Sequence, residues 1–480
     1  MKKIAIFCIP AHGHTNPMLP VAKELVKLGN IVKFYSFDEF ESKIKNTGAE
    51  FVSCTRFLPE INEIEEANLK KSSNTEMTIQ DIRITLAMDD FLDKEFKSFC
   101  PDTVFTDAVC FWGKLNAWKH NVPLVVSTST FAFNQLSATY MKNSPHELWD
   151  MIGGLPKISK ELKTLEPYGY HVKRTLDLIQ NDNNTDTIVY TTKDYQPYGE
   201  SYTDHYIFVG PSVFSETQPD KKKNRPMIYI SMGTVVNEKP EFYKNCIEAF
   251  KDKEIDVIMS CGKNMSEYVP ADLPDNIKAY TSVDQLDVLS KADAFITHCG
   301  MNSVSESLYM ATPMIFYPQT GEQHAVARRA SEIGAGIMLN NDSSSGIYEA
   351  AEKLLGDQKY SLAAKKCSED FRSAPGPKAA AEFIENAPHN VTGTNFLDEL
   401  NKAQGKFIVL YWIAVIALIV LMGILVGWKF VWIIGVTAGI LSYPIGQAVQ
   451  KKNYASLVKK RKRNYAQNKT TRYFFPLHKR

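Results

Sequence analysis

The chain has 480 residues, of which 44% are hydrophobic, and carries 55 basic and 54 acidic side chains. This length accommodates two globular domains and an appendage. The eight cysteines lack the short paired spacings of metal or redox motifs, so we expect free thiols in a reducing compartment. The first apolar run is short, and we do not expect it to be a cleaved signal peptide.

The first predicted elements are a strand at residues 3–9 and an amphipathic helix at residues 17–28. Pro17 suits the first position of that helix because its ring fixes a helical backbone angle. The loop between them holds His12 and His14, at the carboxyl edge of the first strand, where doubly wound sheets bind ligands. Both are therefore candidate site residues, although a single histidine there is more often an ordinary loop residue.

A second buried strand is predicted at residues 102–106, and Asp107 follows it at the same sheet edge. An imidazole with an ordinary pKa of about 6.5 is a weak base. A carboxylate on its far nitrogen fixes the tautomer and stabilises the imidazolium that forms. His14 with Asp107 would make such a general-base dyad. His12 would support this pair without acting as the base.

Alternating strand and helix patterns fill residues 1–208 and then residues 226–385, which is typical of parallel sheets. The segment 209–226, rich in Pro, Ser and Lys, is interpreted as a linker. We predict an α/β protein with two Rossmann-like, doubly wound parallel-sheet domains at residues 1–208 and 227–388. A second linker is predicted at residues 389–406.

Residues 293–323 hold the densest group of candidate binding residues. A predicted strand at 293–297 leads through a turn into a helix at 302–310, so the helix starts at the carboxyl edge of a strand. Its free N–H groups and the positive end of its dipole suit a diphosphate. The side chains that would add donors, and the glycine that would permit close approach, are His298, Asn302, Ser303 and Gly300.

Other side chains of this segment suit the sugars of a sugar nucleotide. Glu306 could accept hydrogen bonds from ribose hydroxyls, and Glu322 with Gln323 follows in a loop where a hexose would lie. Plainer interpretations exist for each. Ser303 and Glu306 also match a capping box that would only stabilise the helix. His298 would otherwise be a loop histidine bonded to backbone carbonyls, and Glu322 with Gln323 would be solvated surface.

Residues 1–385 resemble the family 1 glycosyltransferases, the UDP-glycosyltransferases of GT-B fold, and in particular their bacterial macrolide-glycosyltransferase branch. The resemblance implies two Rossmann-like domains that face a cleft. It assigns the catalytic base to the histidine three residues before the loop proline, which is His14 rather than His12, with Asp107 as its partner. It further implies that His298, Gly300, Asn302 and Ser303 hold the diphosphate, Glu306 the ribose, and Glu322 and Gln323 the donor sugar.

Two other segments match donor-binding positions of the family. The turn with Gly233 and Thr234 resembles its second phosphate-contacting turn. Many members carry a tryptophan that stacks on uracil, followed by Val-Pro-Gln; here those positions hold Ser282, Val283, Asp284 and Gln285. This departure leaves open whether the base is uracil, and backbone contacts near Val283 would then hold it.

The resemblance implies an inverting transfer of a hexose, with glucose expected, from a UDP-sugar to an acceptor hydroxyl deprotonated by His14. The UDP-sugar is a co-substrate, and no cofactor or metal is expected because no Asp-x-Asp motif follows a strand. Aromatic residues scattered through 53–100 and 129–185 favour a hydrophobic acceptor, although such scatter is common in ordinary cores. The alternative is a non-catalytic, membrane-anchored sugar-nucleotide-binding or scaffold subunit, which would need neither His14 nor Asp107.

Two uncharged apolar runs, 407–428 and 430–449, follow the second linker. As helices they would extend about 33 Å and 30 Å, enough for either to cross a bilayer. Lys429 separates them, and we predict a two-helix transmembrane hairpin at 407–449. The alternative is a single span with the other run at the interface, since Pro444 weakens the second helix.

The tail at residues 450–480 carries 11 Lys and Arg and no acidic residue, so the positive-inside rule predicts that it is cytoplasmic. A hairpin would keep the catalytic domains on that same side of the membrane. Residues 1–405 hold 42 basic against 54 acidic residues, a net charge of −12. The tail either binds anionic membrane lipids or is a topology signal only. Nucleic-acid binding is not expected of a charged run beside membrane spans.

Overall fold

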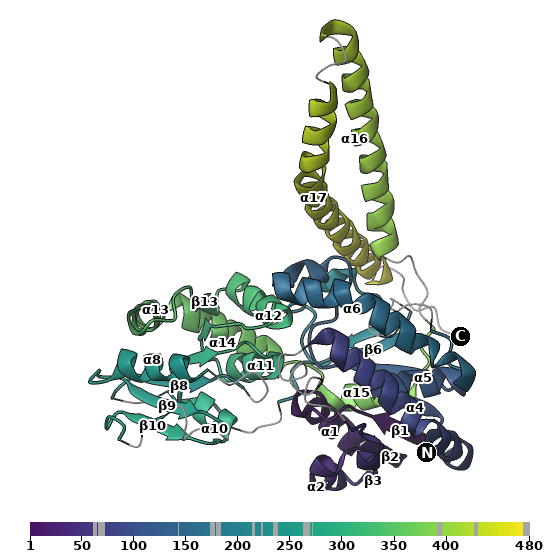
Figure 1. Cartoon of the computed structure of the whole chain (residues 1–480). Coiled ribbons are helices and arrows are strands. Elements are labelled where there is room, and N and C mark those ends of the chain that lie inside the picture. Colours follow the sequence, from purple (N-terminus) through teal and green to yellow (C-terminus); the bar gives the residue numbers. More distant parts are fainter. Residues whose placement is uncertain are drawn as a thin grey trace. The chain divides into compact units, whose positions relative to one another are not determined.

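The computed structural model forms two compact units, Met1–Gly199 with His205–His389, and Glu200–Asp204 with Asn390–Arg480. The first unit contains two sheets with helices on their faces (Figure 1). The structure describes the chain except residues 61–64, 66–72, 143, 173–177, 179–183, 214–216, 222–223, 234–238, 263–268, 271, 391–395, 427–430 and 474–480.

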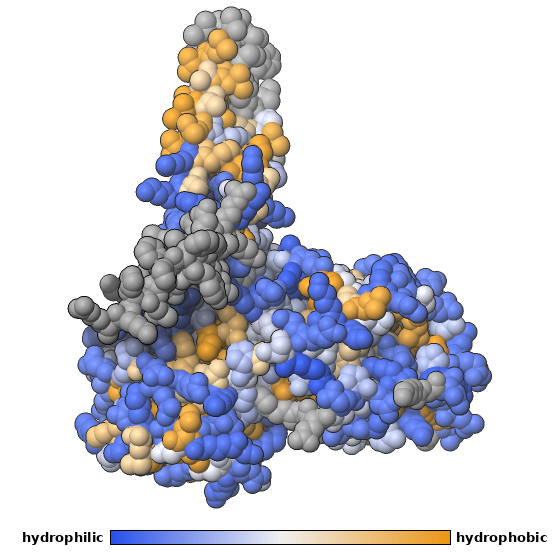
Figure 2. Space-filling view, turned by 180° about the vertical axis from the view of Figure 1, so that it is seen from behind, coloured by the Kyte–Doolittle hydropathy of each residue, from blue (hydrophilic) through white to orange (hydrophobic). Residues whose placement is uncertain are grey.

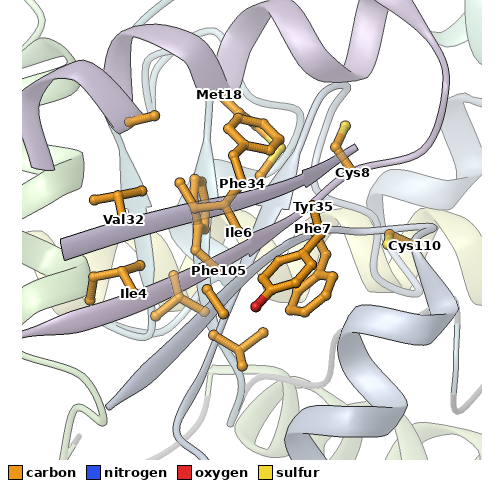
Figure 3. Packing of buried hydrophobic residues seen from close by; sticks show 14 of the residues in the cluster. Ile4, Ile6, Phe7, Cys8, Met18, Val32, Phe34, Tyr35, Phe105 and Cys110 are labelled. Carbon is orange, nitrogen blue, oxygen red and sulfur yellow. The ribbon is translucent and has the colours of Figure 1, made fainter. Parts of the chain in front are cut away.

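The first sheet has seven parallel strands in the order β3-β2-β1-β4-β5-β6-β7. Its central strands are apolar and buried on both faces, as parallel strands covered by helices are. Figure 3 shows Ile6 and Phe7 of β1 beside Tyr35 of β2 and Phe105 of β4. The strands are β1 Lys3–Phe7, β2 Ile31–Ser36, β3 Glu50–Ser53, β4 Thr103–Asp107, β5 Leu124–Thr128, β6 Asp186–Val189 and β7 Tyr206–Phe208.

The second sheet repeats this plan with six parallel strands in the order β10-β9-β8-β11-β12-β13. In both sheets the strand order reverses beside the first strand, which creates a switch point where ligands of doubly wound folds bind. These points lie between β1 and β4 and between β8 and β11. The strands are β8 Met227–Ser231, β9 Asp256–Ser260, β10 Ile277–Tyr280, β11 Ala294–Thr297, β12 Met314–Phe316 and β13 Gly336–Met338.

One helix returns from the second half of the chain to the first sheet. Ala380, Ala381 and Ile384 of α15 belong to the core of the first sheet, and α15 packs against α1 (Figure 1). At its start, Gly376 N donates to Val209 O over 2.9 Å. The helices of the first unit are α1 His12–Lys27, α2 Glu41–Lys45, α4 Asn74–Phe99, α5 Phe111–Lys119, α6 Pro145–Lys163, α8 Pro240–Phe250, α10 Gln285–Lys291, α11 Met301–Tyr309, α12 Gly321–Glu332, α13 Ser344–Gly356, α14 Lys359–Arg372 and α15 Gly376–Glu385.

The predicted α/β class and paired parallel sheets are confirmed, with strand ends within two residues of those expected. The first helix is the exception. It begins at His12 rather than at Pro17, because the N–H groups of His14 and Thr15 already bond to Ala11 O over 3.1 and 2.9 Å. Pro17 and Pro20 thus lie inside the helix, where each removes one backbone hydrogen bond and its ring crowds the carbonyl four residues earlier. His14 therefore lies in the first turn of α1, and not in a loop.

The second unit contains a pair of long helices, α16 Phe396–Val426 and α17 Val431–Tyr473, that pack together. Tyr411 Oη donates to Ala438 O over 2.7 Å, and Arg461 lies 3.1 Å from Glu399. In the described part of the chain, one helix, Phe396–Leu421, is long and apolar enough to cross a membrane, and an 18-residue window within it has a mean hydropathy of 2.1. Hydrophobic surface gathers on this helical pair, whereas the visible surface of the two sheet domains is mainly hydrophilic (Figure 2).

Candidate active site

His14 and Asp107 meet at the switch point of the first sheet. Because β1 pairs with β4, the first turn of α1 lies beside the end of β4. His14 Nδ1 is 2.8 Å from Asp107 Oδ2, and Ser129 Oγ lies 3.1 Å from the same nitrogen. Val109 N donates to the other oxygen of Asp107, which fixes that fully buried carboxylate. The structure thus brings together the two side chains predicted to form the dyad.

The surroundings of His14 raise its pKa above the ordinary value. Burial would lower that pKa, but the charge of Asp107 and its hydrogen bond outweigh the cost of burial. The His14 side chain remains 30% exposed. His12 points elsewhere, with its ring edge-on to Phe40 at 4.9 Å between ring centres. Of the two candidate histidines, His14 is therefore the one that contacts a carboxylate, and its side chain is partly exposed.

Two further ionisable residues near the dyad were missed by sequence reasoning. Asp81 of α4 lies close enough to Asp107 and His14 to interact with their charges. Burial, and to a lesser extent the charge of Asp107, raise the pKa of Asp81 well above the ordinary value. Burial lowers the pKa of Lys114 to about 8, and its Nζ donates to Leu178 O over 2.7 Å. Both lie on amphipathic helices, and no local motif links them to residues so distant in the chain.

At the second switch point, His298 packs against two glycines that face it from adjacent turns. A Cβ on Gly233, whose φ is +78°, would lie 2.5 Å from the His298 ring, and one on Gly300 would lie 2.6 Å from Nε2. Burial lowers the pKa of His298 to about 4, so the ring is neutral at pH 7. Within the described residues its Nδ1 is buried and has no hydrogen-bond partner. Thr234 lies outside the described residues.

Helix α11 begins immediately after this histidine. Its N-cap is Gly300, and no side chain caps the helix. The capping-box interpretation of Ser303 and Glu306 is therefore wrong, because Ser303 stands three residues inside the helix rather than before it. The first N–H groups of α11 thus have no capping side chain in the part of the chain that the structure describes, an arrangement that suits an anion. Asn302, in the same turn, donates from Nδ2 to Gly13 O over 3.2 Å and so links this turn to the His14 helix.

Gln285 joins the predicted ribose site to the segment where the family tryptophan is missing. Its Nε2 donates to Glu306 Oε2 over 2.5 Å and lies 3.4 Å from Ser303 Oγ, while Tyr229 Oη donates to its Oε1. Burial raises the pKa of Glu306, and the Gln285 bond opposes that rise. Ser282 is exposed and Val283 half-buried. Gln285, Ser303 and Glu306, which were all predicted to bind the sugar-nucleotide donor, thus form one hydrogen-bonded cluster.

Glu322 and Gln323 lie in the first turn of α12, which begins after Thr320. Thr320 and Gln323 form a capping box, a role that sequence reasoning missed although the Thr-x-x-Gln spacing announces it. Gln319 N also donates to Gln323 Oε1 over 2.7 Å, so the cap uses the oxygen of this amide and leaves its nitrogen for a ligand. Glu322 is exposed, yet its charge contributes to the raised pKa of His14.

Comparison with known proteins agrees with this architecture. Residues 218–375 match the family model described as UDP-glucoronosyl and UDP-glucosyl transferase. The chain is 32% identical to the NDP-glycosyltransferase YjiC of Bacillus subtilis, over 80% of this chain and 97% of that protein. It is 27% identical to the demethyllactenocin mycarosyltransferase of Streptomyces fradiae, over 80% of this chain and 86% of that protein.

A solved structure shares the fold across both sheets. The crystal structure of CalG4, the calicheamicin glycosyltransferase, superposes with a TM-score of 0.65 at 26% identity, and covers 81% of this chain and all of that one. Two parallel-sheet domains with facing switch points define a glycosyltransferase of GT-B fold. This chain belongs to family 1, the UDP-glycosyltransferases, and is an enzyme that depends on a nucleotide sugar. Its predicted relation to the bacterial branch is confirmed.

Proposed function

We propose that this enzyme is an inverting, metal-independent transferase that moves a hexose, with glucose expected, from a UDP-sugar to a hydroxyl of a hydrophobic acceptor. The observation that carries the proposal is the His14–Asp107 pair at 2.8 Å, linked through Gly13 and Asn302 to the uncapped start of α11. A proton acceptor and an anion site then serve one reaction. This pairing also counts against a non-catalytic scaffold, which would need no buried carboxylate behind a histidine.

In the proposed mechanism, Asp107 holds Nδ1 of His14, so Nε2 takes the proton of the acceptor hydroxyl. The acceptor oxygen forms a bond to the anomeric carbon as the bond from that carbon to the diphosphate breaks, which inverts the configuration. The negative charge that develops on the diphosphate is met by the N–H groups of α11 and the neutral ring of His298. Glu322 and Gln323 would orient the donor sugar.

The donor base would bind around Gln285 and Val283. The Gln285–Glu306 bond supports a preformed ribose site, because it orients the Glu306 carboxylate before a ligand arrives. The exposed Ser282 offers no ring for the base to stack on. We therefore expect weaker selection between uracil and thymine than in members with the tryptophan.

We also propose that the enzyme is anchored in a membrane by a hairpin of α16 and α17, with the catalytic domains and the tail on the cytoplasmic side. The apolar composition of Phe396–Leu421 and the packing of α16 on α17 support the hairpin. The tail's 11 basic residues from 451 onward support the orientation. Residues 427–430, where the first run ends and the second begins, lie outside the described residues.

A direct test measures release of UDP from UDP-glucose, with and without a phenol acceptor, by the wild type and by His14→Ala. We expect acceptor-dependent release by the wild type and a loss of about 100-fold or more in the variant, the usual contribution of a general base. His12→Ala is the matched control, since His12 packs on Phe40 and not on Asp107. Equal rates for the wild type and His14→Ala would leave the scaffold alternative.

A further inference from the structure

Helix α6 exposes three large apolar side chains on the outside of the first domain. Trp149 is 74% exposed, Ile152 60% and Leu155 56%. They recur every three residues, so they lie along one side of the first half of the helix. Single exposed apolar residues are ordinary, but a cluster that includes a tryptophan indicates a surface that contacts something.

The inner side of α6 fixes the orientation of this cluster. Ile158 and Leu162 are buried in a core shared with α4 and α5. Near the start of the helix, Asp150 accepts a hydrogen bond from Ser73 Oγ over 2.9 Å, and Thr75 Oγ1 donates to Asp150 O over 2.9 Å. The helix therefore cannot roll to hide its outer side without breaking these contacts.

The second half of the same outer side is basic. Lys157, Lys160 and Lys163 are exposed, whereas the carboxylates on the same helix, those of Glu147, Asp150 and Glu161, are half-buried. The apolar cluster thus continues into a positive patch on one helix, although residues 1–405 carry a net charge of −12. An apolar stripe with a tryptophan beside lysines is the pattern of a helix that lies in the interface of an anionic bilayer.

This helix also touches the active site. Gly321 N, immediately before Glu322, donates to Glu147 Oε1 in the first turn of α6 over 3.3 Å. On its other side α6 packs against α4, the helix that carries Asp81 near the His14–Asp107 dyad. A molecule bound against α6 would lie beside both the donor-sugar loop and the general base.

We propose that α6 is an interfacial docking helix, whose side formed by Trp149, Ile152, Leu155 and the three lysines seats on an anionic bilayer. This inference deepens the proposed function, because a hydrophobic acceptor would then reach His14 from the membrane rather than from water. A bilayer fits better than a second copy of this chain, since the lysines would face one another across a symmetric contact. The apolar composition of α16, the proposed membrane anchor in the same chain, also favours a bilayer as the partner.

The test places a fluorophore at residue 152 of the full chain, as Ile152→Cys in a Cys100→Ser background, because Cys100 is the exposed free thiol among the eight. The matched control is Leu362→Cys on α14, which is 62% exposed. The labelled proteins are reconstituted in vesicles of phosphatidylcholine, alone or mixed with phosphatidylglycerol, that carry a lipid-attached quencher. We expect at least twofold stronger quenching at position 152 than at position 362, and only with the anionic lipid.

Equal quenching at the two positions, or none at either, overturns the proposal. Shielding of position 152 in detergent that grows with protein concentration also overturns it, because a second copy would then cover the helix. Replacing Lys157, Lys160 and Lys163 together with Gln should abolish the dependence on anionic lipid. These readouts need no turnover, so they remain valid if the proposed transferase activity is absent.

Transferase activity of a double variant then distinguishes lost membrane docking from a damaged fold. Trp149→Glu with Ile152→Glu should slow transfer to an acceptor embedded in the vesicles at least fivefold, while transfer to a water-soluble phenol stays within twofold of wild type. A parallel loss on both acceptors would mean damage to the domain, and the quenching measurement on this variant decides between that and lost docking. If the wild type transferred sugar to neither acceptor, the proposed function would be wrong. The quenching measurement alone would then decide whether α6 docks on the membrane.

Discussion

Asn302 donates from Nδ2 to the carbonyl oxygen of Gly13, 3.2 Å away, and Pro17 makes that oxygen available. In a helix the Gly13 carbonyl would bond to the N–H of residue 17. Proline has no N–H, so the oxygen of the first turn of α1 is left for a donor from outside. One proline thus allows the general-base helix and the anion-binding turn, 289 residues apart, to be held together.

We expect Pro17→Ala to stabilise the fold and slow the reaction at once. The new N–H would satisfy Gly13 O and release Asn302, a neutral hydrogen bond worth about 0.5–1.5 kcal/mol, or about 2- to 12-fold in kcat/KM. Removing a proline from a helix raises its stability, so the Tm should increase. Pro20→Ala is the control, because it restores a bond to a different carbonyl. An unchanged kcat/KM in Pro17→Ala would show that the Gly13 link is irrelevant to turnover.

The pH dependence of kcat/KM should report His14. The base must be neutral to act, so activity falls as pH drops through the His14 pKa, which Asp107 raises above the ordinary value of about 6.5. Asp107→Asn removes that charge while burial persists, so the acid limb should move to lower pH. The plateau rate should drop by about 100-fold or more as the imidazolium loses its partner. A limb that stays in place after this substitution would assign it to another group.

Asp81→Asn should stabilise the enzyme, increasingly so as pH rises. The pKa of Asp81 is raised in the folded state, so the folded protein holds this proton more tightly than the unfolded chain does. Stability is therefore lost as pH increases above the unfolded value of about 4, and the neutral amide avoids that loss. Thermal unfolding of both proteins at pH 5 and pH 8 checks this. A Tm difference that shrinks toward pH 8 would contradict it.

Ser282→Trp should restore a stacking surface for the donor base. Stacking of a base on an aromatic side chain contributes about 1–3 kcal/mol, so the Kd for UDP should decrease about 5-fold or more. The side chain is exposed, so the larger ring meets no core contacts that would oppose it. Calorimetry with UDP and with inorganic diphosphate separates base from phosphate binding, because only the UDP affinity should respond.

Truncation after Ala387 should yield an enzyme that stays in the supernatant when membranes are sedimented in high salt, which screens the proposed contact of α6 with anionic lipid. This cut removes α16 and α17 and retains all but two residues of the first unit, including α15. We expect UDP release with a soluble phenol to be retained within about threefold, since no residue of the dyad or the donor cluster is removed. Continued and salt-resistant sedimentation would mean that the apolar helices are not the main anchor.

Sequence periodicity located the strands because both sheets are parallel and doubly covered, so their strands are short apolar runs. Ligands of doubly wound folds bind at the carboxyl ends of the strands. His14 was therefore predicted to lie near Asp107, since the two residues follow neighbouring strands. The predicted start of α1 at Pro17 was wrong. It relied on the preference of proline for a first helical position, whereas hydrogen bonds to Ala11 O already form the first helical turn at His12. Asp81 was missed, and the bond from Gln285 to Glu306 was not foreseen although both residues were predicted to bind the donor, because these contacts depend on tertiary packing alone.

The return of α15 to the first sheet means that the polypeptide passes between the two sheet domains twice. The two crossings touch, because Gly376 N bonds to Val209 O, and a Cβ on Gly210 would lie 2.2 Å from the Cβ of Ala374. A change in the angle between the two sheet domains would therefore have to be accommodated by both crossings together. Gly210 and Gly376, both with a positive φ, stand at this meeting of the two crossings, far in sequence from His14 and from the start of α11.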